Sequence, residues 1–134
     1  MLKLVRFLAA VAVSVSLAAC GGVSSPSTQS SEDFSGTLDP LGQSFKTFSA
    51  SKTGELQVTL QTLTPRPVVG FVVLALGAPA NGGCSLLRYI ALQAAVGTPY
   101  SSYVDIKGTY CIILADANGI LPSQVSWTMR VSHP

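Results

Sequence analysis

Apolar and polar side chains alternate strictly in two stretches of this sequence. Glu55–Leu60 (ELQVTL) and Val125–Val131 (VSWTMRV) place an apolar residue at every second position. A β-strand turns successive side chains to opposite faces, so this period of two predicts strands with one buried and one solvated face. A third run, Val68–Leu76, is apolar on both faces apart from Gly70 and predicts a central strand.

Further short segments also fit strands. They are Phe34–Leu38, Ser44–Ser49, Leu86–Leu92, Tyr100–Val104 and Thr109–Ala115. Turn-forming residues separate them, as in Asp39–Gly42, Ala80–Gly83 and Asp116–Gly119. About eight strands at this spacing predict an all-β fold, a single antiparallel β-sandwich. The composition of Leu86–Val96 also allows a short helix, which is the alternative for this segment.

The first residues have the layout of an export signal. Lys3 and Arg6 give a basic start, Phe7–Val15 is almost wholly apolar, and small residues precede Cys20. The apolar run is shorter than the roughly 20 residues that a membrane-spanning helix needs. We therefore predict that residues 1–19 are a signal peptide that is removed.

The tetrapeptide Leu17-Ala18-Ala19-Cys20 resembles the bacterial lipobox. This resemblance implies that a diacylglyceryl group is attached to the sulfur of Cys20 and that cleavage occurs just before it. Two or three acyl chains make such an attachment effectively permanent. Gly21 stands where an aspartate would imply inner-membrane retention, so the resemblance implies the bacterial cell envelope, in an outer membrane facing the periplasm. The alternative is ordinary secretory cleavage, which gives a soluble exported protein.

A flexible tether is expected after the leader. Residues 20–33 contain the lipidated cysteine and the stretch GGVSSPSTQSS, which has too few apolar side chains to fold. The sandwich domain is then predicted over residues 34–134. Removal of Lys3 and Arg6 with the leader leaves six basic residues against six acidic ones (8 − 2 = 6). A neutral chain without a basic stripe excludes nucleic acid as a partner.

Cys84 and Cys111 remain as a pair once Cys20 carries lipid. Disulfides form and persist outside the cytoplasm, so these two cysteines are predicted to be linked. Closing this loop stabilises the folded state by about 3–4 kcal/mol in the chain-entropy model. A redox or metal-binding pair is the alternative, but metal sites need clustered ligands and the sequence holds one histidine, His133.

Five short segments each begin with a glycine or an aromatic residue. They are Phe34–Leu38, Phe45–Phe48, Gly54–Leu60, Gly108–Asp116 and Trp127–Val131. In this order they resemble the bacterial pre-peptidase C-terminal family. Members of that family are jelly-roll-like β-sandwiches that accompany secreted enzymes, and some relatives bind collagen or calcium. The resemblance implies a jelly-roll-like sandwich over most of residues 34–134.

Catalytic motifs are absent from the sequence. It has no G-x-S-x-G, no H-E-x-x-H and no glycine-rich phosphate loop after a strand. We therefore predict no catalytic residues, no metal site and no cofactor. A calcium site built from Glu32, Asp33 and Asp39 is the alternative, because calcium binds six to eight oxygen atoms.

These patterns together favour a non-catalytic structural or binding module, attached to the membrane through Cys20, whose partner is an envelope protein or a glycan. A glycan site requires exposed aromatic rings, for which Tyr89, Tyr100 and Tyr103 are candidates. A protein site requires an exposed apolar patch or an uncovered strand edge instead. The alternative class is a hydrolase with an unrecognised site.

Overall fold

The computed structural model describes residues 29–67 and 70–134, and within these ranges every regular element is a β-strand. The strands are β1 (Ser30–Leu38), β2 (Gln43–Ala50), β3 (Gly54–Thr64), β4 (Val72–Ala80), β5 (Gly83–Ala94), β6 (Pro99–Val104), β7 (Gly108–Ala115) and β8 (Val125–His133). The predicted all-β class and the number of strands are confirmed.

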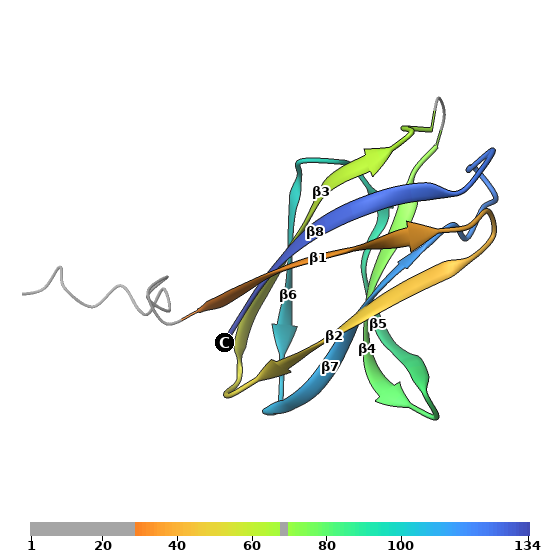
Figure 1. The fold of residues 1–134 in the computed structure, drawn as a ribbon. Helices are drawn as coiled ribbons and strands as arrows, with labels where there is room; N and C mark the ends of the chain where they lie inside the picture. Colours follow the sequence, from red (N-terminus) through yellow and green to blue (C-terminus); the bar gives the residue numbers. More distant parts are fainter. Residues whose placement is uncertain (1–28, 68–69) are drawn as a thin grey trace, which may run out of the picture.

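The strands form two antiparallel sheets of four that pack face to face (Figure 1). The first sheet has the order β1-β8-β3-β6 and the second sheet has the order β2-β7-β4-β5. Strands that follow one another in the chain mostly lie in opposite sheets, so the chain winds around the sandwich. This order is that of a jelly roll, in which two Greek keys close over one core.

The alternating stretches supply the core, as predicted. Leu56, Val58 and Leu60 of β3 are fully buried, and the inward residues of β8 lie beside them. From the second sheet, core residues such as Leu74 and Leu76 of β4 cover the other side. Burying one such side chain contributes about 1.5–3 kcal/mol, which makes this alternation the main determinant of the fold.

Two strands start four residues away from their predicted first residue. Strand β1 begins at Ser30 rather than Phe34, because its first residues pair with the end of β8, where Ser30 lies opposite His133. Strand β4 begins at Val72 rather than Val68; residues 68–69 lie outside the described residues, and Gly70 has a φ of 85°. That positive φ belongs to the left-handed region and interrupts an extended strand.

The segment that also suited a short helix is a strand. Strand β5 spans Gly83–Ala94 and pairs with β4 through a tight hairpin at Asn81 and Gly82, both of which have positive φ. Two consecutive residues with positive φ favour a two-residue hairpin turn. Pairing with the apolar strand β4 therefore overrides the modest helix propensity of this segment.

The outer faces of the two sheets differ in chemistry. The outer face of the first sheet is rich in hydroxyls and contains Ser31, Ser35, Thr37, Thr62, Thr128 and Ser132. The outer row of the second sheet is apolar, with Val73 and Ala75 on β4 and Ile113 on β7. We call these the hydroxyl face and the apolar face. The contrast follows from the sequence, because β4 and β7 are apolar at successive positions whereas β3 and β8 alternate.

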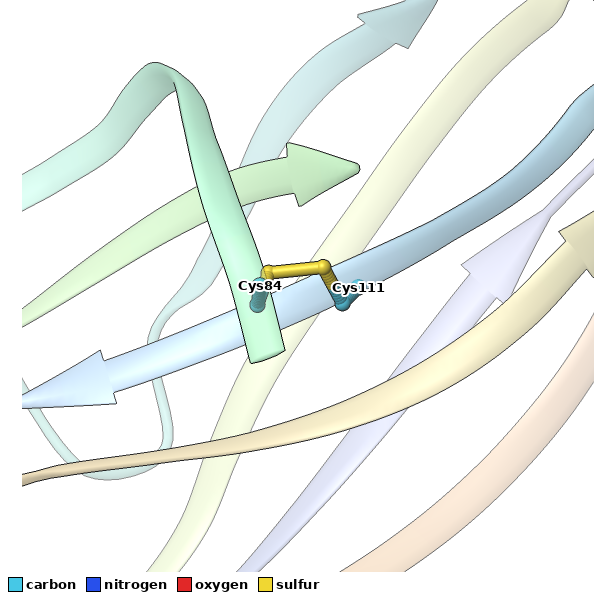
Figure 2. Close-up of a disulfide and its surroundings, with 2 residues drawn as sticks. All are labelled: Cys84 and Cys111. Carbon is cyan, nitrogen blue, oxygen red and sulfur yellow. A yellow bond between two sulfur atoms is a disulfide. The ribbon is translucent and has the colours of Figure 1, made fainter. Parts of the chain in front are cut away.

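The predicted disulfide between Cys84 and Cys111 is present (Figure 2). Its cysteines lie on β5 and β7, which flank β4, and their Cα atoms are 6.1 Å apart. Since Tyr110 and Ile112 pack on the core, Cys111 points to the apolar face. The bridge passes over Gly77 of β4, where a Cβ atom would lie 3.2 Å from the sulfur of Cys111 and closer still to that of Cys84.

A side chain at position 77 should therefore disturb this crossing. In Gly77→Ala the added methyl would also lie 2.6 Å from the carbonyl oxygen of Ser85. We expect a loss of about 1–3 kcal/mol in the free energy of unfolding, the usual cost of overpacking, and incomplete formation of the disulfide. Chemical denaturation and intact mass after thiol alkylation measure both effects.

Gly83→Ala is the matched control, because a Cβ there would meet only the Ala80 carbonyl oxygen at an ordinary 3.6 Å. Wild-type stability together with complete disulfide formation in Gly77→Ala would contradict this account of the crossing.

Candidate functional site: a groove on the apolar face

A groove of about 400 Å³ lies on the apolar face where three segments meet. Its floor includes Val73 of β4, and Phe71 precedes that strand. Tyr89 and Leu92 of β5 form one side, and Ile120 from the β7–β8 connection forms another. These segments are far apart in the sequence and are brought together by the jelly-roll winding.

The rim of the groove is unusually apolar for a surface. Phe71, Tyr89 and Leu92 are 45%, 59% and 62% exposed. Tyr89 pairs with Ala75, whose neighbours Leu74 and Leu76 are in the core, so Tyr89 projects from the apolar face. Contiguous exposed apolar side chains on a soluble domain commonly mark an interaction site.

The wall formed by Ile120 is fixed by close contact with the chain opposite. A Cβ atom at Gly70 would lie 2.6 Å from Cγ2 of Ile120, so the side chain of Ile120 packs directly on the backbone of Gly70. The φ of 85° at Gly70 suits glycine and sets the direction in which the chain enters at Phe71. The groove is thus shaped by the contact of the Ile120 side chain with a residue that has no side chain of its own.

A buried carboxylate holds the segment that carries Ile120. Asp116 is 1% exposed, and its Oδ1 accepts a hydrogen bond from the backbone N–H of Ile120 at 2.8 Å. Its Oδ2 accepts from the N–H of Leu121 and from that of Leu41, each at 3.1 Å. One side chain therefore joins the β1–β2 and β7–β8 connections and positions the wall of the groove.

These bonds also explain the acidity of Asp116. Burial acts to raise the pKa of its carboxyl group, but hydrogen bonds from the backbone N–H groups of Leu41, Ile120, Leu121 and Gly119 outweigh burial and lower the pKa below its ordinary value. The stabilisation from Asp116 is therefore complete above the unfolded-state pKa of about 3.9 and is lost as the pH falls towards the lower folded-state pKa.

Asp116→Asn should destabilise the protein by about 1–3 kcal/mol near neutral pH, because the amide cannot accept hydrogen bonds at both positions and buried N–H groups lose partners. Its stability should also fall less steeply than that of the wild type when the pH is lowered from about 5 to about 3. Denaturant titrations at a series of pH values measure both the stability near neutral pH and its dependence on pH.

Asp105→Asn is the control, since Asp105 forms only an exposed ion pair with Arg88 and such pairs contribute little. Asp33 also has a lowered pKa, caused by its hydrogen bonds from Arg130, and acts equally in wild type and Asp116→Asn. If the stability of wild type and that of Asp116→Asn fell equally steeply as the pH is lowered, Asp116 would not be the buried acceptor described.

A second, smaller hollow of about 210 Å³ lies next to the groove and shares Phe71 with it. Leu63, Val72 and Ala94, all buried, line it, and the exposed Arg66 lies at its edge. Gly70 and Phe71 line both hollows. The smaller hollow is below the range of about 300–1,000 Å³ typical of ligand pockets, whereas the groove lies within it.

The three tyrosines proposed for glycan contact do not form one site. Only Tyr89 lines the groove. Tyr103 is exposed on the outer face of the first sheet, opposite Glu55, and thus belongs to the other side of the sandwich. The hydroxyl of Tyr100 donates to the carbonyl of Gln93 and accepts from the N–H of Ala95, so Tyr100 has a structural role at the β5–β6 connection.

The acidic residues considered for calcium point to different partners. Glu32 lies 2.8 Å from Nε2 of His133, Asp33 binds Arg130 through two contacts of 2.8 Å, and Asp39 accepts a hydrogen bond from Gln124. Glu32 and Asp33 are adjacent on β1 and therefore face opposite sides of the sheet. Across residues 29–67 and 70–134 no three His, Cys, Asp or Glu side chains gather as metal ligands would.

His133 has a structural environment. It is 3% exposed, its ring centroid lies 4.8 Å from that of Phe48, and its Nε2 meets Glu32. The residue therefore ties the end of β8 to β1 and to the second sheet.

The lipidation residue proposed from the sequence, Cys20, lies outside the described residues. Within those residues no helix is long and apolar enough to cross a membrane.

The sequence prediction missed Phe71, Leu92, Gln93 and Asn118 as groove residues. Phe71 carried a usable signal, since it is the one aromatic side chain in a two-sided apolar run and lies next to a glycine. The amides of Gln93 and Asn118 carried no such signal, because polar residues near strand ends and turns are common.

No family model matches the chain, and no curated protein matches it. Among solved structures, the chain is similar to a chain in the structure of infectious bursal disease virus Gt strain, with a TM-score of 0.31 and 18% sequence identity. The match covers 78% of this chain and 31% of that chain, so this chain spans about a third of the length of the viral one. Similarity at this level has no bearing on function.

Proposed function

We propose that this protein is a lipid-anchored bacterial envelope protein whose β-sandwich is a non-catalytic binding module, and that the partner binds in the groove on the apolar face. The observation that carries the binding role is the exposure of Phe71, Tyr89 and Leu92 around one groove whose wall is held by a buried carboxylate. The lipobox-like sequence ending at Cys20 supports the anchor.

The direction of the chain also supports this arrangement. The chain enters β1 at Ser30, which pairs with His133 at the end of β8 (Figure 1). The groove lies at the opposite end of the sandwich, beside the β7–β8 connection that leads into the start of β8. Strand β1 spans roughly 30 Å at about 3.3 Å per residue, so a module tethered at Ser30 can present its groove away from a bilayer.

The anchor predicts a defined behaviour for Cys20→Ala in the native host. Without the sulfur no acyl chain can be attached, so the protein should move from the membrane fraction to the soluble fraction. The intact mass of the wild type should show acyl chains on an N-terminal Cys20, and the mass of the variant should not. Two or more chains hold a protein on a bilayer, so the shift should be nearly complete.

Cys84→Ala is the control, because it removes a disulfide partner and should leave acylation and fractionation unchanged. An unmodified Cys20 in wild-type protein isolated from membranes would overturn the anchor while leaving the groove untouched.

The binding role predicts where contacts form in the intact envelope. A photocrosslinking amino acid at Leu92, on the groove, should give discrete adducts in living cells. The same residue at Ile106 is the matched control, because Ile106 is also exposed and apolar, at 69%, but lies in the β6–β7 turn. Adducts of equal yield at both positions, or none at Leu92, would count against the groove as the binding surface.

A further inference from the structure

The groove combines aromatic rings, aliphatic side chains and uncharged amides. The rings of Phe71 and Tyr89 and the side chain of Leu92 are exposed around it. Gln93 and Asn118, both exposed, contribute side-chain amides at its rim. No side chain with a formal charge lines it within the described part of the chain. A ligand for this lining has apolar faces, hydroxyl-like polar groups and no charge.

A sugar ring meets these requirements. Its C–H faces are apolar and pack on aromatic rings, which present a large rigid surface. Its hydroxyls both donate and accept hydrogen bonds, and an amide side chain offers two donors and an acceptor with two lone pairs. An anionic ligand would find no cation among the groove residues, and a purely aliphatic one would leave the amides of Gln93 and Asn118 unpaired.

The groove has the size and the fixed shape that such recognition requires. Its volume of about 400 Å³ lies in the range of small-molecule sites. Its wall at Ile120 is held by Asp116 and by contact with Gly70, so binding does not have to order this segment. A preformed wall reduces the entropic cost of binding and leaves more of the contact energy as affinity.

The hydroxyl face of the first sheet is a weaker candidate for the same ligand. Four of its six hydroxyl residues already bond in pairs, Ser31 to Ser132 and Thr62 to Thr128, each at 2.7 Å, and Arg130 bonds to Asp33. Its exposed aromatic residue, Tyr103, is not joined by a second ring there among the residues that the structure describes. Hydroxyls that already bond to one another offer a sugar little that water does not.

We propose that the groove between Phe71, Tyr89 and Asn118 binds an uncharged glycan, with its sugar rings against the aromatic side chains and its hydroxyls bonded to the amides of Gln93 and Asn118. This inference rests on the proposed binding function and names its ligand class. It is independent of the anchor at Cys20.

The test is titration calorimetry of the purified full-length protein in detergent with two uncharged oligosaccharides, chitotetraose and cellotetraose. At least one should bind saturably with a dissociation constant at or below about 1 mM. Tyr89→Ala and Asn118→Ala should each weaken binding about tenfold, which corresponds to about 1.4 kcal/mol. Both residues are exposed, so the variants should keep the wild-type melting temperature and circular dichroism spectrum.

Tyr103→Ala is the matched control, because it removes another exposed tyrosine, 49% against 59% for Tyr89, from the opposite face and should leave the affinity unchanged. The glycan inference is overturned if neither sugar binds at about 10 mM, or if Tyr103→Ala weakens binding as much as Tyr89→Ala. If no sugar binds but Leu92 gives adducts with an envelope protein in cells and Ile106 does not, the ligand class is wrong and the proposed binding function stands. If sugar binding depends on Tyr89 and Asn118, the inference is supported.

Discussion

Strands β4 and β7 are apolar on both faces, but the first sheet of the sandwich can cover only one of these two faces. The first sheet packs on the inner row, which includes Leu74, Leu76 and Leu114. The outer row has no second layer, yet Val73 and Ala75 are almost completely buried. Tyr89 of β5 pairs with Ala75. Tyr89, Leu92 and Ile120 line the groove together with Val73, and the disulfide crosses Gly77 farther along β4. The groove lies over Val73, with Tyr89 and Leu92 on one side and Ile120 on another. The candidate site is thus a consequence of the hydrophobic pattern that makes β4 a central strand.

Asp116 connects the stability of the fold to the geometry of that site. A buried carboxylate is costly unless hydrogen bonds satisfy it, and here the donors are backbone N–H groups from two connections. The bonds that compensate for burial also fix Ile120, against which Gly70 packs. The position of Phe71 at the groove therefore depends on a residue that does not itself line the groove. Substitutions at Asp116 should alter ligand binding and stability together, whereas those at exposed rim residues should separate the two.

The sequence predicted the strands well, but it did not predict which residues of separate segments lie together. Alternation at Glu55–Leu60 and Val125–Val131 identified β3 and β8, because burial on one face imposes a period of two. The disulfide followed from the number of cysteines and the expected compartment. The start of β1 at Ser30 was missed, since polar residues there are stabilised by pairing with β8 rather than by their own character. The groove was missed because Phe71, Tyr89 and Asn118 come from three separate segments, and only the strand order β7-β4-β5 brings them together.

The edge strand of the second sheet is apolar, but several of its features oppose pairing with a strand of another chain. Strand β5 is an edge strand with exposed Leu86, Leu87, Tyr89 and Leu92, and a regular edge of this kind invites pairing with another chain. Its pairing with β4 changes register at three places, between Val72 and Leu74, between Leu74 and Ala75, and between Leu76 and Gly77. Such irregularities bend a strand and break the even row of backbone groups that a second strand needs. The charge of Arg88, paired with Asp105, adds a further obstacle in the middle of the strand. For the proposed binding role, the side chains of strand β5 are therefore more accessible than its backbone, which favours recognition in the groove over addition of a strand at the edge.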